Sequence, residues 1–246
     1  MNGFAATILL TALLLAPGGA AAACRQALTI GLDISGSVDD DEYRLQMDGL
    51  ARALLYPEVQ SAFLSMPGVP VYLHVYEWAG SSSQTEILPW TAINSAEDLG
   101  KVSRHLMSVP RQPREVATAL GTAMVFGAAA LAQQPDCWRH TIDLTGDGES
   151  NIGPRPRDVR DLPVFADITI NALVIGADAA PFTDARFSEI EKLRGYFTEE
   201  VIMGPDAFVE AATDFETFEQ AMARKLLKEL QTITIGQVET QAIRRQ

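Results

Sequence analysis

Short apolar runs that alternate with longer amphipathic segments constrain the fold of this chain most strongly. The first run, residues 27–33 (ALTIGLD), is apolar at most positions, which is typical of a strand buried on both faces of a parallel sheet. Further strands are predicted over residues 69–78, 85–90, 139–145, 167–175 and 200–203. Helical segments separate most of these runs, and this alternation predicts a parallel sheet with helices on both faces.

The second and third predicted strands depart from the parallel arrangement. Residues 69–78 and 85–90 are joined through the turn residues 80–83 (GSSS), which are too few for a crossover helix, so the pair is predicted to be an antiparallel hairpin. The predicted fold is therefore α/β, a doubly wound, Rossmann-like sheet of six strands, mostly parallel, with one antiparallel edge strand. No internal repeat or linker divides the chain, so we predict one domain over 24–230 and a C-terminal tail over 231–246.

The helices are predicted from the spacing of apolar residues and from capping residues. Ser37 is the expected N-cap of the first helix, and we interpret the acids 39–42 as offsetting the helix dipole rather than as a second metal site. Further helices are predicted over 94–109, 117–133, 155–165, from Thr183 to Arg194, and over 214–230. In the last of these, we expect five side chains to face inward: Phe215, Phe218, Met222, Leu226 and Leu227.

The N-terminal segment is typical of an export signal. Residues 4–15 (FAATILLTALLL) form an apolar run shorter than the roughly 20 residues of a membrane-spanning helix, and small residues follow at 20–23. We predict a signal peptide over 1–23 and export to the periplasm or the outside of the cell, with an uncleaved anchor as the alternative. No later apolar stretch is long enough to span a membrane, so no transmembrane helix is predicted in the mature chain.

The charge balance limits the classes of partner. The chain has 19 Lys and Arg against 32 Asp and Glu, a net charge of −13, and it has no basic cluster, which excludes nucleic acid as the expected partner. No phosphate-binding loop, dinucleotide fingerprint or G-x-S-x-G nucleophile motif occurs. The chain is therefore not expected to be an enzyme of these classes.

Oxygen-bearing side chains follow two of the predicted strands. Residues 33–37 (DISGS) follow the first strand, and residues 145–149 (TGDGE) follow the strand over 139–145. Ligands bind beyond the carboxyl ends of such strands, and oxygen-only ligands suit Mg²⁺, with Mn²⁺ and Ca²⁺ as alternatives. The competing interpretation is that Asp33 only starts a helix and that Ser35 and Ser37 only cap a loop.

Three separated motifs resemble the metal-ion-dependent adhesion site (MIDAS) of von Willebrand factor type A domains. Asp33-x-Ser35-x-Ser37 is similar to its first motif, residues 118–124 (TALGTAM) to its second, and Asp147 to its third, with one more glycine than usual before it. Within that superfamily, the chain over about 28–230 resembles a bacterial secreted family called domain of unknown function 1194. That likeness also includes residues 77–80 (EWAG), 89–91 (PWT), 143–148 and the closing amphipathic helix.

The resemblance implies a site and a function. It implies that Asp33, Ser35, Ser37, Thr118 and Asp147 hold a divalent cation, whose open position accepts an Asp or Glu carboxylate from a protein partner. The implied function is a secreted adhesion-type binding module; we expect it to be a monomer and not an enzyme. The alternative is a phosphatase-like metal-dependent hydrolase using the same Asp/Ser cluster. Three further residues are expected at the rim or behind the ligands: Glu77, Glu149 and Asn151.

The two cysteines are placed by counting back along the strands. Cys24 and Cys137 precede Asp33 and Asp147 by nine and ten residues, so they are expected side by side at the opposite end of neighbouring strands. We predict a Cys24–Cys137 disulfide, which export permits, with lipid attachment at Cys24 as the alternative.

One aspartate lies within a strand rather than at its end. Asp143 falls inside the predicted strand 139–145, where an unpaired charge is costly. We therefore expect a structural role, with pairing to Arg139, His140 or a loop amide.

Overall fold

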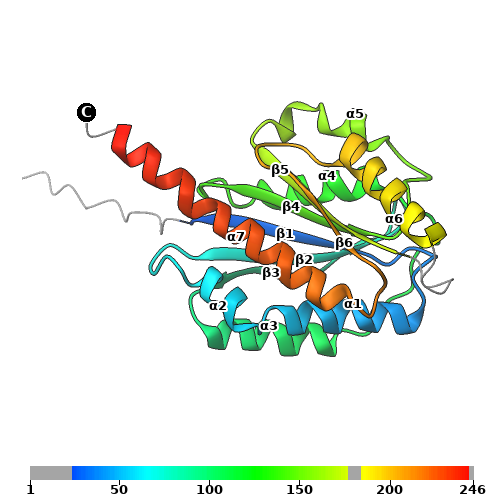
Figure 1. The fold of residues 1–246 in the computed structure, drawn as a ribbon, viewed down its shortest axis with the longest axis horizontal. Coiled ribbons are helices and arrows are strands. Elements are labelled where there is room, and N and C mark those ends of the chain that lie inside the picture. The colour runs from blue at the N-terminus through cyan, green and yellow to red at the C-terminus, as the bar shows by residue number, and fades with distance from the viewer. Residues whose placement is uncertain (1–23, 177–183, 244–246) are drawn as a thin grey trace, which may run out of the picture.

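A six-stranded sheet runs through the described part of the protein, which in this computed structural model comprises residues 24–176 and 184–243 (Figure 1). The strands are β1 (Gln26–Asp33), β2 (Val71–Trp78), β3 (Gln84–Ile93), β4 (His140–Gly146), β5 (Ile168–Ile175) and β6 (Val209–Ala212). They lie in the order β3-β2-β1-β4-β5-β6, and only β2 and β3 pair antiparallel. The predicted α/β sheet with one antiparallel edge strand is confirmed. The predicted signal peptide, 1–23, lies outside the described residues.

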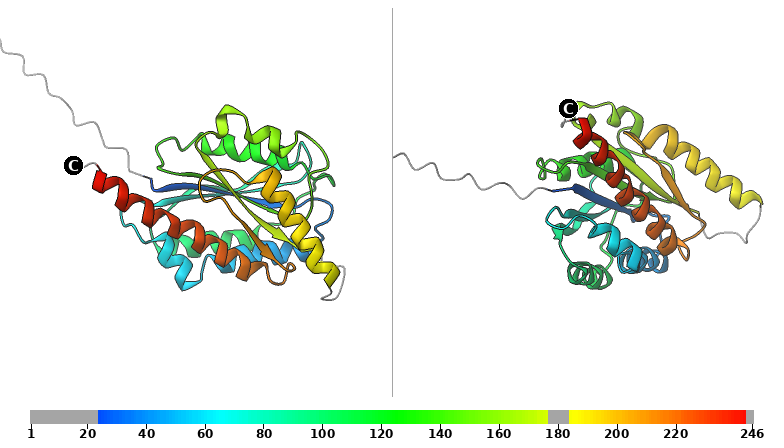
Figure 2. Two further views of the ribbon diagram at one scale, coloured as in Figure 1. Left: turned by 45° about the horizontal axis from the view of Figure 1, so that its top comes forward. Right: turned by 60° about the vertical axis from the view of Figure 1, so that its left-hand side comes forward.

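Helices cover both faces of the sheet (Figures 1 and 2). On one face lie α1 (Asp40–Ala53), α2 (Pro57–Phe63), α3 (Ala96–Ser108) and α7 (Phe218–Ile243). On the other lie α4 (Leu120–Leu131), α5 (Pro156–Arg160), the short 3₁₀ turn Pro163–Phe165 and α6 (Asp184–Tyr196). Each face has its own apolar core, because strands buried on both sides present side chains alternately to the two helical layers. None of the described helices combines the length and apolar character that crossing a bilayer requires.

The sixth strand was assigned to the wrong segment. Residues 200–203 were expected to form it, but Phe197–Val201 is a π-helical turn, and only Met203 bridges Ile170. Phe197 and Val201 are both buried four residues apart, which is helical spacing, while Glu200 is held by Arg155 and Arg157. The actual sixth strand, Val209–Ala212, is only four residues long (VEAA) and contains little of the β-branched and aromatic character that marks a strand.

The N-cap of α1 is Asp39 rather than Ser37. Asp39 Oδ1 accepts the Glu42 N–H at 2.9 Å, and Glu42 Oε2 accepts the Asp39 N–H at 2.7 Å, which is a capping box. The Ser37 hydroxyl donates instead to Asp147, so it does not serve the helix. One of the acids 39–42 is therefore the N-cap of α1, and the other three lie in its first turn. This agrees with their interpretation as residues that stabilise the start of a helix.

The last helices differ from their predicted limits. Thr183, the expected cap of α6, lies outside the described residues, and α6 is described from Asp184. Helix α7 begins at Phe218 and runs to Ile243, so much of the segment expected as a tail continues this helix. Of the side chains expected to face inward, Leu227 is partly buried, and the others are fully buried: Phe215, Phe218, Met222 and Leu226.

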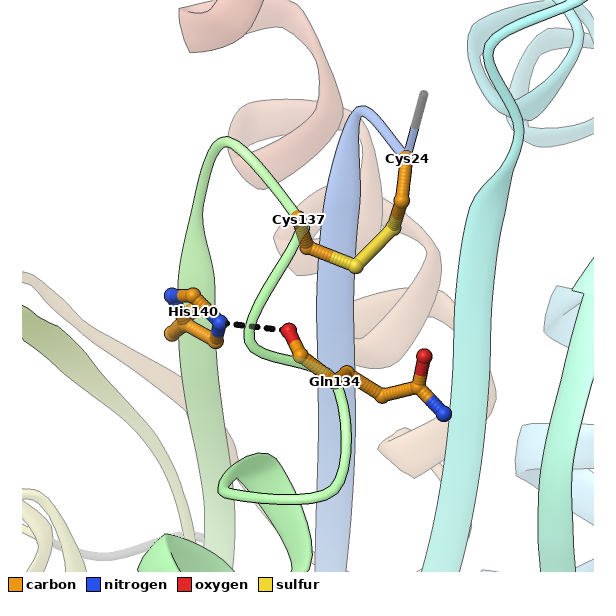
Figure 3. The surroundings of a disulfide bond; sticks show 4 residues. All are labelled: Cys24, Gln134, Cys137 and His140. Atoms are coloured by element: carbon orange, nitrogen blue, oxygen red, sulfur yellow. Dashed lines mark hydrogen bonds between the residues drawn. A yellow bond between two sulfur atoms is a disulfide. The ribbon is translucent and has the colours of Figure 1, made fainter. Parts of the chain in front are cut away.

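The predicted disulfide is present between Cys24 and Cys137, whose Cα atoms are 4.4 Å apart (Figure 3). It joins the segment before β1 to the segment before β4, and the Trp138 N–H donates to the Cys24 carbonyl beside it. Figure 3 also shows the nearby 2.8 Å contact between His140 Nε2 and the Gln134 carbonyl. The disulfide therefore lies at the amino ends of the two central strands.

The predicted partners of Asp143 were wrong. Asp143 is fully buried against Lys225 of α7, whose Nζ contacts both the Asp143 carboxyl group and Glu229 Oε1, the latter at 2.9 Å. Burial, reinforced by the Glu229 carboxylate, raises the pKa of Asp143 to about 8. This cluster links the middle of β4 to α7.

Candidate metal centre

The two central strands separate at their carboxyl ends. The β1–β4 pairing ends at Gly31↔Leu144, whereas β1 stays paired with β2 as far as Asp33↔Trp78, and β4 stays paired with β5 as far as Gly146↔Val174. From β1 the chain continues to β2 on one side of the sheet, and from β4 it continues to β5 on the other side. The gap between the ends of β1 and β4 is therefore the switch point in strand order, where ligands bind in open α/β sheets. Asp33 ends one of these strands, and Asp147 follows the other.

A chain of polar contacts joins Asp33 to Asp147 through the two serines. The Ser35 N–H donates to Asp33 Oδ1 at 2.8 Å, the Ser35 and Ser37 hydroxyl oxygens lie 3.4 Å apart, and Ser37 Oγ donates to Asp147 Oδ1 at 2.8 Å. Four of the five predicted ligands are thus gathered at one place. Each contributes an oxygen, the ligand type that hard divalent cations prefer.

Thr118, the fifth predicted ligand, is held beside this loop by backbone contacts. The Gly36 N–H donates to the Val116 carbonyl at 2.8 Å, and a Cβ on Gly36 would lie 2.2 Å from Val116 Cγ1, so glycine allows this close approach. Asn151 Oδ1 accepts the Thr118 N–H at 2.9 Å, and the Asn151 N–H donates to the Thr118 carbonyl at 2.9 Å. Asn151, expected near the rim, therefore fixes the backbone of Thr118 at both polar groups.

The electrostatics of the two acids favour a bound cation. Asp33 is 1% exposed, and its Oδ2 has no hydrogen-bond partner among the described residues. Burial, followed by repulsion from Asp147, raises the pKa of Asp33 to about 8, and burial also raises the pKa of Asp147. An unpartnered carboxylate oxygen beside a second carboxylate is costly without a counter-charge, and a divalent cation would supply one. The donor set therefore fits such an ion.

Glu77 and Glu149 lie apart from this chain of contacts. Glu77 pairs in register with Leu32, so its side chain lies on the α1 face of the sheet, whereas the Asp33 side chain lies on the α4 face. On the α1 face, the Tyr43 hydroxyl of α1 donates to Glu77 Oε1 at 2.6 Å. Burial raises the pKa of the Glu77 carboxyl. Glu149 is exposed, and Lys192 Nζ lies 3.6 Å from its Oε1.

Two arginines to which the sequence analysis gave no role support the 33–37 segment. Arg114 Nε donates to the Ile34 carbonyl, and its Nη2 donates to the Val38 carbonyl at 2.9 Å. Arg111 donates to the Val38 carbonyl and pairs with Asp40. The sequence feature that could have pointed to them is the occurrence of two arginines close together in a strongly acidic chain. Such a pair is expected to bind acidic or carbonyl groups of a neighbouring segment.

The three histidines contact other parts of the molecule. His74 lies between Thr29 Oγ1 at 2.7 Å and Glu86 Oε2 at 3.1 Å, and His105 contacts the Ile87 carbonyl at 2.6 Å. His140 contacts the Gln134 carbonyl. Across residues 24–176 and the described part beyond 184, no three His, Cys, Asp or Glu side chains gather as a metal cluster. The candidate centre thus consists of two carboxylates and hydroxyls, without a nearby imidazole base.

Comparisons with known proteins agree with this geometry. The family described as "Protein of unknown function (DUF1194)" matches residues 23–234. No curated protein sequence matches the chain at a significant level.

Several solved structures share this fold, and one of them is a von Willebrand factor type A protein. Proximal thread matrix protein 1 from the mussel byssus, in a form with a zinc-occupied MIDAS motif, is 17% identical, with a TM-score of 0.54 over 85% of this chain and 48% of that chain. A von Willebrand factor type A protein from Catenulispora acidiphila is 14% identical, with a TM-score of 0.54 over 84% of this chain and 43% of that one.

A third match is the pilus adhesin SpaC from Lactobacillus rhamnosus GG, which is 14% identical, with a TM-score of 0.55 over 85% of this chain and 31% of that chain. The present chain thus spans about half, or less, of the length of these structures. At these identities the likeness concerns the fold.

Proposed function

Because the chain belongs to the DUF1194 family and has the fold of von Willebrand factor type A domains, we propose that it is an exported, metal-ion-dependent protein-binding module. In this proposal Asp33, Ser35, Ser37, Thr118 and Asp147 hold a divalent cation, with Mg²⁺ first and Mn²⁺ or Ca²⁺ as alternatives. The observation that carries the proposal is the buried Asp33 Oδ2 without a hydrogen-bond partner, at a site joined to Asp147 through Ser35 and Ser37.

An open coordination position would let a bound cation capture an anionic group. Two ionised carboxylates only just offset the two positive charges of the cation, and the serine and threonine hydroxyls are neutral ligands, so the protein would not surround the cation with excess negative charge. A bound cation would supply an attraction for a further carboxylate at an open coordination position, and this attraction strengthens where the contact excludes water. An Asp or Glu side chain of a protein partner is the group proposed for that position.

Exposed apolar side chains next to the site support a protein partner. Val116 is 78% exposed and lies against Gly36, and Ile152 is 48% exposed and follows Asn151. Both adjoin residues that hold Thr118 or the serine loop, so a partner whose carboxylate reaches the site would also contact them. Apolar burial around a carboxylate–cation contact adds affinity and removes water from the charged pair.

Two observations support a location outside the cytoplasm. The disulfide between Cys24 and Cys137 is typical of oxidising compartments. The mussel thread protein and the pilus adhesin that share the fold carry names of extracellular structures. Export to the periplasm or the outside of the cell, and a monomeric state, remain parts of the proposal.

Isothermal titration calorimetry tests the metal site directly. Mg²⁺, Mn²⁺ and Ca²⁺ are titrated into the wild-type chain, into Asp33→Asn and into the control Asp136→Asn, which changes an exposed aspartate next to the disulfide at the other end of the sheet. We expect binding by the wild type and the control and its loss in Asp33→Asn. If none of the three cations binds the wild type, the proposal is wrong.

A second experiment separates a binding module from a hydrolase. Proteins from the envelope fraction are captured on the immobilised chain with Mg²⁺ or with a chelator, and the chain is also assayed for p-nitrophenyl phosphate turnover. We expect chelator-sensitive capture of a partner and no turnover above that of Asp33→Asn. Metal-dependent turnover that Asp33→Asn abolishes would support the hydrolase instead.

A further inference from the structure

The backbone of Asp33 has no strand neighbour on the β4 side. In β1 the odd-numbered residues direct their backbone polar groups toward β4, as the Ala27 N–H does when it donates to the Arg139 carbonyl at 2.9 Å. The ladder between these strands ends at Gly31↔Leu144, two residues before Asp33. The Asp33 N–H and carbonyl therefore need other partners, because they are buried.

Two buried side chains supply those partners in a closed ring of hydrogen bonds. Thr145 Oγ1 accepts the Asp33 N–H at 3.0 Å, and Gln46 Nε2 donates to the Asp33 carbonyl at 2.8 Å. The ring closes because the Thr145 hydroxyl donates to Gln46 Oε1 at 2.6 Å. Gln46 and Thr145 are both 0% exposed, so water does not compete for these groups.

We infer that Gln46 and Thr145 are positioning residues that set the separation of Asp33 and Asp147 and thereby the size of the cation that fits between them. Thr145 lies two residues before Asp147 on the same chain segment, so its bond to the Asp33 N–H ties the ends of β1 and β4 together at a fixed spacing. Gln46 adds a third point of attachment, because it belongs to α1 and holds both partners. The inference rests on the proposed metal-binding function.

Cation size is the property that this spacing should control. Mg²⁺ binds oxygen at about 2.1 Å in a strict octahedron, whereas Ca²⁺ accepts about 2.4 Å and variable geometry. If the ring is broken, the ends of β1 and β4 beyond the Gly31↔Leu144 pair lose two of the contacts that hold them together, and the site loses its preference for one size. A change in the ratio of Mg²⁺ to Ca²⁺ affinity is therefore expected, beyond any loss of overall stability.

The chain contains a matched control pair on the same two strands. Gln26 Nε2 donates to Thr141 Oγ1 at 2.8 Å, and both residues are buried, as Gln46 and Thr145 are. Gln26 begins β1 and Thr141 lies near the start of β4, close to the disulfide and far along the strands from Asp33. Thr141→Val removes the same chemical group from the same strand as Thr145→Val without touching the ring.

The test compares Mg²⁺ and Ca²⁺ dissociation constants by calorimetry for the wild type, Thr145→Val, Gln46→Leu and Thr141→Val. We expect Thr145→Val and Gln46→Leu to change the Mg²⁺/Ca²⁺ affinity ratio about tenfold, and Thr141→Val to leave it within about twofold. Thr145→Ser, which retains the hydroxyl, should restore the wild-type ratio. A ratio unchanged in both ring variants, or changed equally by Thr141→Val, overturns the inference. If Thr145→Val does not fold, Gln46→Leu and Thr145→Ser decide.

A measurement without metal separates this inference from the proposed function. Hydrogen exchange of the Asp33 amide is followed in the metal-free chain, where the Thr145 hydroxyl is its acceptor. We expect faster exchange of this amide in Thr145→Val than in Thr141→Val. If no cation binds the wild type, the proposed function fails. If the Asp33 amide exchanges in Thr145→Val as slowly as in Thr141→Val, the ring does not hold Asp33, and the inference fails.

Discussion

Ser37 and Asp147 are 110 residues apart in the sequence, yet the Ser37 hydroxyl donates a 2.8 Å hydrogen bond to Asp147 Oδ1. This contact joins the loop after β1 to the loop after β4 across the separated strand ends. It also explains why the cap of α1 passes to Asp39. Ser37 therefore belongs to the link between the two acids, and the start of the helix is set by the Asp39–Glu42 capping box.

Replacing this serine should weaken metal binding far more than folding. We expect Ser37→Ala to raise the Mg²⁺ dissociation constant about tenfold, the effect of losing one ligand and one charge-assisted hydrogen bond. Because Ser37 is exposed, the free energy of unfolding should change by less than about 1 kcal/mol. Calorimetry and urea denaturation measure the two quantities. The control Ser61→Ala, which changes an exposed serine of α2, should leave both unchanged.

Removing the disulfide should lower stability without altering the metal site. The bond closes a loop between residues 113 apart, so Cys24→Ser with Cys137→Ser should lower the free energy of unfolding by about 2–5 kcal/mol. The two cysteines lie at the amino ends of β1 and β4, and the candidate ligands lie at the carboxyl ends. Urea denaturation measures the loss, and calorimetry should give the wild-type Mg²⁺ affinity. A loss of Mg²⁺ affinity in the cysteine variant would contradict the expectation that the disulfide end of the strands does not affect the metal site at the other end.

The buried Asp143 should make the protein less stable as the pH rises. Its pKa is about 8 in the folded state because of burial and Glu229, whereas the pKa of an unfolded aspartate is about 4. Between these values the folded state holds a proton that the unfolded state has released, so the free energy of unfolding falls with rising pH and levels off above about 8.

Asp143→Asn should reduce this slope, because an amide does not titrate and only the contributions of the other buried acids remain. Urea denaturation in chelator at a series of pH values, with wild type and variant in parallel, isolates the contribution of Asp143 from that of Asp33, which has the same sign. Equal slopes in the two proteins would mean that Asp143 keeps its ordinary ionisation in the fold. Asp136→Asn serves as the surface control.

The apolar rim should matter for the partner but not for the cation. Val116→Ser and Ile152→Ser change side chains that are 78% and 48% exposed, so neither folding nor Mg²⁺ affinity should change measurably. Metal-dependent capture of the partner from the envelope fraction should fall several-fold in the double variant, because burying each of these side chains against a partner stabilises the complex by about 1 kcal/mol. Val125→Ser, an exposed valine on α4, is the matched control. Undiminished capture would place the partner elsewhere on the surface.

The topology and the gathering of the candidate ligands could be predicted because both follow from strand order. Asp33 and Asp147 each come directly after a buried run, and parallel strands bring their carboxyl ends to one edge. The same counting placed Cys24 opposite Cys137. These inferences need only the position of a residue along its strand.

Contacts between side chains of distant elements could not be predicted in this way. The partner of Asp143 is Lys225, which the sequence placed only in a helix far along the chain. Gln46 carried a weaker signal, because it lies three residues after Tyr43 and four before Leu50, on the face of α1 that is otherwise apolar. A polar residue on such a face indicates a buried hydrogen bond, but the pattern does not name its partner.

The disulfide has a mechanical consequence. A tension applied to the chain at Cys24 passes through the sulfur bridge into Cys137 as well as along the backbone into β1, so both strands carry the load together. The two strands that lead to Asp33 and to Asp147 are thereby pulled in the same direction from the same end. The hydrogen bonds on either side of these strands then resist sliding collectively rather than opening one after another. A binding module tethered at this end would transmit force to a captured partner without first unzipping its own central strand.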